Sequence, residues 1–178
     1  MGDSRYLTSA LVLDASPLIY LAKLDALDVL AVAAEHSFAT PTVLEEVTRP
    51  QIAYRHPDAV VIEQTVDSGM IGVLDLVKAE AEAAADMAQR VPGLDPGEAE
   101  VIAVAIERSI PAVIFERRAQ RVAVSLGAPL VDVVELLVAG TTGSVLREER
   151  VVRFARLVNM RLDDAVELLA RIRSSKLG

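Results

Sequence analysis

Short, almost wholly apolar runs alternate with helix-length segments along most of this chain. The runs at 10–13 (ALVL) and 112–115 (AVIF) lack any polar alternation, which predicts strands that are buried on both faces. Buried strands separated by helices form a parallel sheet, because each crossover helix covers one face of that sheet. The sequence therefore predicts an α/β fold with helices on both sides of a parallel sheet.

Three helices are expected to begin at a polar cap followed by proline. The pairs are Ser16-Pro17, Thr40-Pro41 and Asp95-Pro96. Proline suits the first helical position, where its missing N–H costs nothing, and the preceding side chain can accept a hydrogen bond from the first turn. Asp95 is followed three residues later by Glu98, which completes the pattern of a capping box.

Further strands and helices complete the predicted order. The strands are expected at 37–40, 59–64 and 129–131. Helical spacing predicts helices at 17–35, with a break near Asp25, and at 41–49, 74–90, 99–109, 117–127, 131–140, 148–158 and 162–173. Glu80, Glu82 and Asp86 are expected on the solvated side of the helix at 74–90. Residues 49–58 contain two prolines and are expected to form a loop.

Size and composition limit the architecture and the chemistry. The 178 residues suit one domain, expected at 1–143, with a C-terminal helical extension at 144–178 packed on it. The absence of Cys excludes disulfides, thiolate nucleophiles and Cys-based metal sites. The N-terminal stretch has no basic region and Asp14 interrupts the apolar run behind it. We therefore expect neither a signal peptide nor a spanning helix, and a cytoplasmic protein without a membrane partner.

The net charge of -8 disfavours broad electrostatic adhesion to nucleic acid, which usually needs a basic face. If the substrate is a nucleic acid, metal ions and a local arginine patch must offset the negative charge of the protein. The C-terminal helices carry seven arginines: Arg147, Arg150, Arg153, Arg156, Arg161, Arg171 and Arg173. In one interpretation they form a basic rim that contacts phosphates. In the other, which is more usual, they are the solvated side chains of an amphipathic arm that packs on the core or across a dimer.

Four carboxylates are expected at one edge of the predicted sheet. Asp14 and Glu116 directly follow strands, and Glu46 and Glu98 lie in the early turns of helices. Grouped carboxylates oppose one another's ionisation, and a divalent metal relieves that repulsion. Ligands that offer only oxygen suit Mg²⁺ or Mn²⁺, and water bound to such an ion becomes acidic enough to attack phosphorus in line.

Each of these acids also has a purely structural interpretation. Capping alone explains Glu98, Glu46 can be a solvated neighbour of Glu45, and Glu116 can pair with one of the arginines that follow it. Asp14 is the strongest candidate, because a carboxylate that ends an apolar strand is costly without a partner. Ser16 is first of all a helix cap, although its hydroxyl could also bind a metal-bound water. No role is assigned to His36 or His56.

Four segments together resemble the PIN-domain family, including its VapC-like ribonucleases. They are LVLDASPLIYLAKL, TPTVLEEV, LDPGEAEVIAVAIE and VIFERRAQRVAVSLG, which occur in the family's order between about residues 10 and 140. The resemblance is in particular to a branch of PIN-like proteins with an Asp-x-Ser-Pro-Leu-Ile opening and an Asp-x-Gly-Glu-Ala helix. The resemblance implies a three-layer α/β/α fold with a five-stranded parallel sheet and a ribonuclease site that depends on Mg²⁺ or Mn²⁺. It also implies the toxin of a toxin–antitoxin pair, commonly a homodimer that an antitoxin protein inhibits.

By position, the resemblance assigns the first acid to Asp14, the helix acid to Glu46 and the third acid to Glu98, with Ser16 as the hydroxyl residue. This chain departs from the pattern at two places. Phe115-Glu116 replaces a pair of aspartates, and Val131-Asp132 replaces Gly-Thr. Asp95 or Asp132 would then supply the missing charge. We expect Asp14, Glu98 and Glu116 to hold the metal, and Glu46 to support it or to position the attacking water.

Two other functions compete with the nuclease. A degenerate PIN domain would bind RNA or a protein without cutting, and its metal affinity would distinguish it. A phosphotransfer fold also begins with an Asp after the first strand, as in haloacid-dehalogenase phosphatases and receiver domains. The phosphatases, however, expect a second Asp where Ser16 stands, and receivers expect an acid pair that the N-terminal segment lacks.

Overall fold

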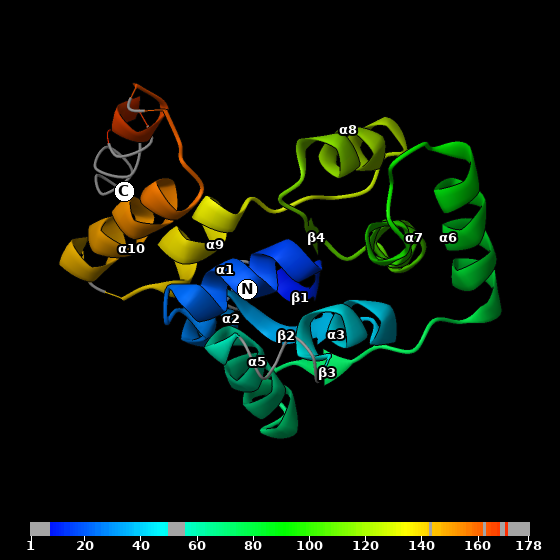
Figure 1. The fold of residues 1–178 in the computed structure, drawn as a ribbon, viewed down its shortest axis with the longest axis horizontal. Helices are drawn as coiled ribbons and strands as arrows, with labels where there is room; N and C mark the ends of the chain where they lie inside the picture. The colour runs from blue at the N-terminus through cyan, green and yellow to red at the C-terminus, as the bar shows by residue number, and fades with distance from the viewer. Residues whose placement is uncertain (1–7, 50–55, 143, 162, 168–169, 171–178) are drawn as a thin grey trace, which may run out of the picture.

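The sheet is parallel and has four strands (Figure 1). The computed structural model describes residues 8–49, 56–142, 144–161, 163–167 and 170. Its strands are β1 Thr8–Leu13, β2 Ala34–Ala39, β3 Gly72–Val73 and β4 Ala112–Val113. They lie in the order β3-β2-β1-β4, and all neighbouring pairs are parallel. The predicted α/β class with a parallel sheet is confirmed.

Helices connect the strands and surround the sheet (Figure 1). They are α1 Ala15–Lys23, α2 Leu30–Ala33, α3 Pro41–Thr48, α5 Pro57–Asp67, α6 Lys78–Arg90, α7 Pro96–Arg108, α8 Arg117–Ser125, α9 Val133–Gly140 and α10 Ser144–Leu157, with a 3₁₀ turn η1 at Leu27–Val29. Residues 163–167 are also helical. α1, α3 and α5 pack against one another, while α9 packs against α2 and α10.

β1 and α7 form the centre of the hydrophobic core. Leu11, Val12 and Leu13 of β1 are fully buried, and so is nearly every side chain at 101–105 of α7. A helix that is apolar all round belongs in the interior, and the small Ala and Val side chains of α7 let its neighbours approach closely. In the described part of the chain, no helix combines the length and the apolar character that crossing a bilayer requires.

The cap-and-proline pattern correctly predicts the starts of α3 and α7, but not that of α1. Thr40 caps α3 by accepting a hydrogen bond from the N–H of Val43 over 3.4 Å. The expected cap Ser16 instead lies within the first turn of α1, whose N-cap is Asp14. Because Asp14 is still extended at the end of β1, the helix begins immediately after it, and the proline at position 17 is tolerated in the first turn.

The strand expected at 59–64 is wrong, since this segment belongs to helix α5. Pro57 starts the helix, and Ala59, Ile62 and Thr65 are buried at helical spacing, whereas Val60 and Val61 are exposed. Burial of one helical face against α1 and α3 outweighs the β-propensity of the valines. The edge strand of the sheet is instead β3, which the sequence pattern did not predict.

The fifth strand, expected at 129–131, is reduced to an isolated bridge between Leu130 and Ala112. The described sheet therefore has four strands where five were expected. The strand expected at 37–40 begins earlier, at Ala34, because the chain becomes extended at the end of α2. The break expected at Asp25 is confirmed, since this residue has a positive φ of 52° between α1 and η1.

Glu80 is buried, although it was expected on the solvated side of its helix. Only 1% of the residue is exposed, and its carboxylate accepts hydrogen bonds from the Arg108 guanidinium and, over 2.8 Å, from the N–H of Val77. The pair joins α6 to α7, and the Arg108 guanidinium holds the pKa of Glu80 below its usual value. Helix α6 begins at Lys78 rather than at 74, because Leu74 still continues the ladder with Ala39 of β2.

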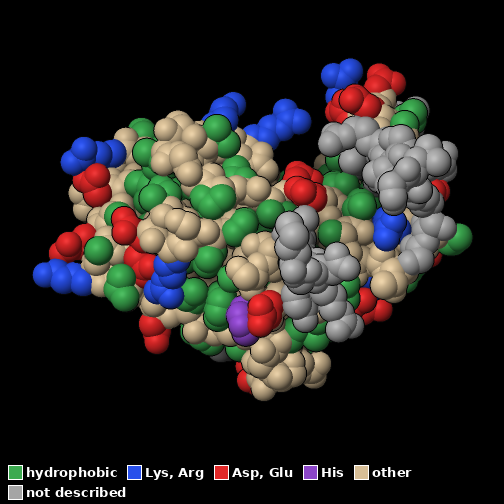
Figure 2. All heavy atoms as spheres, turned by 180° about the vertical axis from the view of Figure 1, so that it is seen from behind, with side chains coloured by type: hydrophobic (Ala, Val, Ile, Leu, Met, Phe, Trp, Pro, Cys, Tyr) green, Lys and Arg blue, Asp and Glu red, His purple; other side chains and the backbone are tan. Residues whose placement is uncertain are grey.

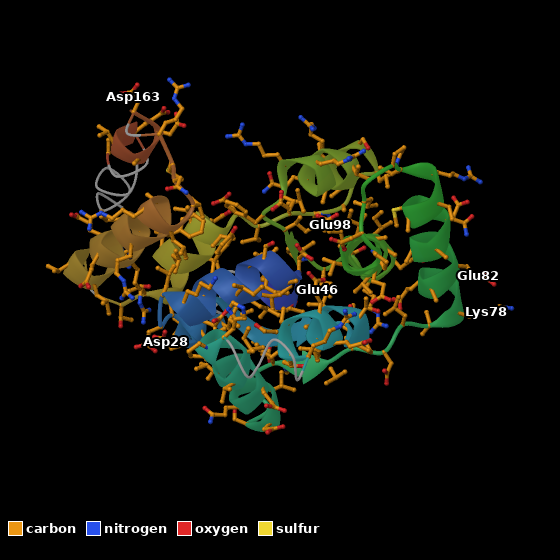
Figure 3. All side chains as sticks on the ribbon, in the orientation of Figure 1. Asp28, Glu46, Lys78, Glu82, Glu98 and Asp163 are labelled. Carbon is orange, nitrogen blue, oxygen red and sulfur yellow. The ribbon has the colours of Figure 1, made fainter. Side chains whose placement is uncertain are left out.

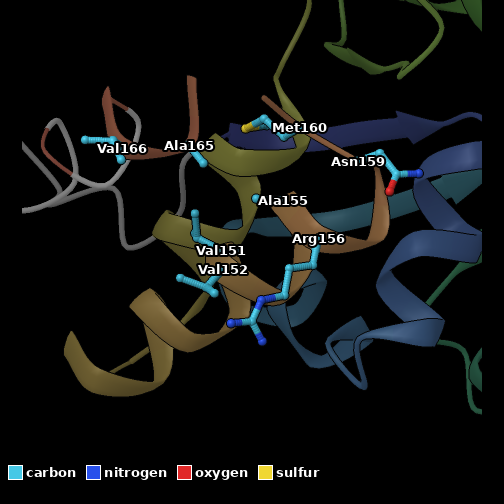
Figure 4. Close-up of a pocket in the computed structure, with 8 residues that line it drawn as sticks. All are labelled: Val151, Val152, Ala155, Arg156, Asn159, Met160, Ala165 and Val166. Atoms are coloured by element: carbon cyan, nitrogen blue, oxygen red, sulfur yellow. The ribbon is translucent and has the colours of Figure 1, made fainter. Parts of the chain in front are cut away.

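Helix α10 is anchored to the core by an aromatic cluster. Tyr20, Phe115 and Phe154 meet edge to face, with ring centroids 4.8–6.0 Å apart. An apolar groove of about 430 Å³ runs between α10 and the segment after it (Figure 4). The second C-terminal helix, expected at 162–173, lies partly outside the described residues.

The C-terminal arginines do not form one common surface. Arg150 is buried, where it contacts Asp28 over 2.7 Å, the hydroxyl of Thr141 and the carbonyl of Asp25. Arg153, Arg156 and Arg161 are exposed. The two arginines at 171 and 173 lie outside the described part of the chain. Arg150 thus has a structural role in place of the phosphate contact considered for it.

Candidate active site

Asp14 lies at the carboxyl end of β1, where the strand leads directly into α1. Its N–H donates to the carbonyl of Val113 over 3.0 Å, so the ends of β1 and β4 meet beside it. Its side chain makes no capping hydrogen bond, and only 3% of the residue is exposed. A buried carboxylate is costly unless it binds a cation or a proton. Asp14 therefore marks the edge of the sheet where positive charge is needed.

The start of α7 adds two acids to this edge. The N–H of Glu98 donates to Oδ1 of Asp95 over 2.8 Å, and the N–H of Asp95 donates to Oε2 of Glu98 over 3.1 Å. These reciprocal bonds form the capping box predicted from the sequence. They occupy Oε2 of the buried Glu98 and leave its Oε1 for another ligand. Capping and ligand binding are thus compatible roles of the same side chain.

Glu46 extends from α3 towards the start of α7, where Gly97 has no side chain to fill the space between the two helices. A Cβ on Gly97 would lie 3.3 Å from Cγ2 of Val43, 3.4 Å from Oδ1 of Asp95 and 3.5 Å from Oε2 of Glu46. A Cβ at 97 would therefore crowd Val43 slightly and lie against the carboxylates of Asp95 and Glu46, so the glycine eases the close approach of α3 and α7. Figure 3 shows Glu46 and Glu98 in the space between α3 and α7, next to α1.

The carboxylates raise one another's pKa values by electrostatic repulsion. Burial raises the pKa of Asp14 from its usual 3.8 to about 7, and the charges of Glu98, Asp95 and Glu46 add to that increase. Burial is also the main cause of the raised pKa of Glu98, followed by the charges of Asp95, Glu116 and Glu46. The pKa of Glu46 is raised by burial and by Asp95, against the influence of Arg49. We call Asp14, Glu46, Asp95, Glu98 and Glu116 the acid cluster.

Glu116 completes the cluster from the start of α8. It is the exposed N-cap of that helix, without a side-chain capping bond, so its carboxylate is available to a ligand. Its charge raises the pKa of Tyr20, after burial, which places the Tyr20 side chain beside this rim of the cluster. Tyr20 could not be selected from the sequence, because a helical tyrosine among apolar residues is typical of a core. Gly97 was also missed, although it belongs to the Asp-Pro-Gly-Glu motif.

The two supporting residues Ser16 and Asp132 differ in their relation to the acid cluster. Ser16 is half-buried in the first turn of α1, and no described residue shares a hydrogen bond with its side chain. Asp132 caps α9 by accepting a hydrogen bond from the N–H of Val134 over 2.7 Å. Asp132 does not act on the pKa of Asp14, Glu46 or Glu98. Of the two acids considered as replacements for the missing aspartate, Asp95 is the one that joins the cluster.

The chemistry of the cluster fits a hard divalent ion. Among the described residues, no three acidic or histidine side chains converge as a ready-made set of metal ligands. Mg²⁺ does not need such a cage, since it usually keeps several waters and binds one or two carboxylates. None of the five acids forms an ion pair within the described ranges, so their charge is not neutralised by the protein itself. All available donors are oxygens, which suit Mg²⁺ or Mn²⁺.

Comparison with known proteins agrees with this fold. No curated protein matches the chain. A family model described as a PIN domain matches residues 10–166, a range that contains all five residues of the acid cluster. PIN domains are nuclease-type domains that act on nucleic acid and generally depend on divalent metal. Because the match covers well over half of the 178 residues, the chain belongs to the PIN-domain family, as its motifs predicted.

Proposed function

We propose that this protein is a divalent-metal-dependent ribonuclease whose acid cluster is the active site. The burial of Asp14 is the observation that carries the proposal. This carboxylate has a pKa of about 7, lies among four other acids, and forms no ion pair with any described residue. A hydrogen bond from the N–H of Ala15 stabilises the charged carboxylate only in part, so a proton or a cation must supply the rest. A proton would leave the other acids of the cluster without compensation.

The acids of the cluster have distinct roles in this proposal. Asp14 and Glu98 from the buried side, and Glu116 from the exposed side, hold the metal. A bound Mg²⁺ or Mn²⁺ would neutralise these carboxylates, take up a phosphate oxygen and make water more acidic. Glu46 is exposed at the rim, where it is placed to position a water and take its proton. Asp95 supports Glu98 through the capping box.

Ser16 and the biological setting are further parts of the proposal. The Ser16 hydroxyl, two residues after Asp14 in the first turn of α1, is assigned the orientation of a ligand or a water. The resemblance to toxin–antitoxin nucleases supports a homodimeric toxin that an antitoxin protein inhibits. We also propose that α10 and the residues after it form an extension packed on the same domain, since Phe154 and Arg150 are buried against it.

The test is cleavage of a mixed pool of single-stranded RNA with and without Mn²⁺. Asp14→Asn should reduce metal-dependent cleavage at least about 100-fold, because losing a ligand should cost no less than losing a group that only supports one. Glu45→Gln is the matched control, since Glu45 is the exposed neighbour of Glu46 and pairs with Arg49. It should leave cleavage within about twofold of wild type. Equal cleavage by wild type and Asp14→Asn would point to a contaminating nuclease and refute the assignment.

A binding module that does not cut is the second candidate function. It is favoured by Phe115, which replaces an acid of the family pattern and is used for packing against Tyr20 and Phe154. The site therefore has fewer charges than its relatives and an exposed glutamate in place of an aspartate. RNA binding without cleavage, together with no measurable Mn²⁺ affinity, would support this function over the nuclease.

A further inference from the structure

An open cleft of about 690 Å³ lies between α8 and α9, and Arg117 on its wall directly follows Glu116 of the acid cluster. Arg117 and Arg121 line it from α8, Asp132 and Glu135 line it from α9, and Ile114 and Leu130 form part of its floor. Arg117 and Arg121 are four residues apart on one helix, so they share a face. The side chain of Gln120 donates to the carbonyl of Ile114 over 2.8 Å and so fixes this helix to the end of β4.

The two arginines of the cleft have no partner within the described part of the chain. Four other arginines are paired with acids: Arg49 with Glu45, Arg90 with Asp86, Arg108 with Glu80, and Arg150 with Asp28. Arg118, between the two, lies against Gly93 instead. Arg117 and Arg121 are both exposed and line a hollow, so their guanidinium groups are free to bind an anion.

The cleft lies on the side of β4 away from β1. Val12 of β1 pairs with Ala112 of β4, and Ala112 pairs with Leu130 on the floor of the cleft. From β1 across β4 to Leu130 there are two strand spacings, or about 10 Å. The backbone of a nucleic-acid strand can cover that distance between the scissile phosphate and another phosphate close to it. Arg117 also directly follows Glu116 of the acid cluster. The acid cluster and the cleft thus form one continuous edge of the sheet.

We propose that the cleft between α8 and α9 binds a phosphate adjacent to the scissile phosphate of single-stranded RNA, with Arg117 and Arg121 as the phosphate ligands. This inference rests on the proposed function for the position of cleavage. Asp132 and Glu135 on the opposite wall repel phosphate and so keep it on the α8 side. Glu135 is also placed to accept a hydrogen bond from a base amino group.

The proposal also explains how an acidic chain holds an acidic substrate. The face in Figure 2 shows basic side chains only singly, among acids and apolar groups, with two of them standing out where α8 lies. With a net charge of -8, long-range attraction cannot collect RNA. Local arginines that are not neutralised by neighbouring acids are then the groups that retain the strand. We assign this role to Arg117 and Arg121 because both line one cleft next to Glu116, whereas Arg150 is paired with Asp28 and Arg153 and Arg156 lie on α10, outside that cleft.

The test measures RNA binding without cleavage. A short fluorescein-labelled single-stranded RNA is titrated in EDTA over a series of NaCl concentrations, and anisotropy gives the affinity. Arg117→Ala combined with Arg121→Ala should lower the slope of log affinity against log salt by about 1.4, or about 0.7 for each lost phosphate contact. At 0.1 M salt this corresponds to roughly 25-fold weaker binding. Replacing both arginines with Lys should retain the slope, because lysine keeps the charge.

Arg153→Ala combined with Arg156→Ala is the matched control on the exposed surface of α10. It should leave both affinity and slope unchanged. An unchanged slope in the α8 double variant, or an equal loss in the α10 control, would overturn the proposal. Unchanged RNA binding would leave the cleft as a site for an acidic protein segment instead. Thermal unfolding of each variant confirms that it is folded.

Cleavage separates this inference from the proposed function. If Asp14→Asn abolishes cleavage while the α8 double variant binds RNA like wild type, the nuclease stands and the phosphate site is refuted. If the α8 double variant loses affinity but no protein cuts RNA, the phosphate site stands and the nuclease is refuted.

Discussion

At the scale of single residues, Asp14 carries the main electrostatic cost of the candidate site, because its carboxylate is buried at the end of β1 next to other acids. Its position after an apolar strand was enough to select it, because that pattern places a carboxylate at the buried end of a sheet. Its neighbours Asp95 and Glu98 were found through the capping box. The effect of the Glu116 charge on the pKa of Tyr20 could not be predicted. It depends on how α1 and α8 are placed relative to each other in three dimensions.

The raised pKa of Asp14 predicts that the metal-free protein loses stability as pH rises. The folded state holds the proton up to about pH 7, whereas the unfolded chain releases it near 3.8. Stability is therefore greatest below the unfolded pKa and falls through the interval up to the folded one, by an amount on the order of 4 kcal/mol. Denaturant unfolding in EDTA between pH 5 and pH 8 should show the part of this decrease that lies above pH 5, roughly 2–3 kcal/mol.

Asp14→Asn should flatten most of that decrease and make the metal-free protein more stable than wild type at pH 8. Glu46 and Glu98 also have raised pKa values, so a smaller decrease of the same sign remains. Wild-type stability that rises from pH 5 to pH 8 in EDTA would contradict the burial of this charge.

At the scale of elements, local patterns predicted most helices but not all strands. The strand expected at 59–64 failed because a run of β-branched residues has the same local preference in either structure, and only its partners decide. β3 has two residues and the expected fifth strand is a single bridge, so neither carries a periodicity that could be read. Glu80 was misplaced because its partner Arg108 is 28 residues away in sequence.

The pair of the buried Glu80 and the exposed Arg108 should be the main polar link between α6 and α7. Arg108→Ala would leave the carboxylate of Glu80 buried without its partner, which should lower the free energy of unfolding by about 3 kcal/mol. Arg90→Ala removes an exposed pair with Asp86 on the same helix and should cost about 0.5 kcal/mol or less. Urea unfolding measures both, and equal small losses would show that the link does not stabilise the protein.

At the scale of the whole molecule, a parallel sheet gathers residues that are far apart in the sequence. Asp14, Glu46, Asp95, Glu98 and Glu116 come from four separate segments and meet at one edge, as parallel strands with helical crossovers require. The unpaired arginines of α8 continue that edge, although the net charge is -8. The fold class and this convergence follow from the order of elements. The cleft depends on side-chain packing between α8 and α9, which that order does not determine.

The most direct test of the central claim is Mn²⁺ binding to the acid cluster, measured by titration calorimetry at pH 7 in buffers with different ionisation enthalpies. Wild type should bind Mn²⁺ and release about half a proton, because Asp14 has a pKa of about 7 and must lose its proton to the metal. Asp14→Asn should bind at least about tenfold more weakly, with little proton release. Equal Mn²⁺ affinity in the two proteins, or no binding in either, would contradict the claim that this cluster is the metal site.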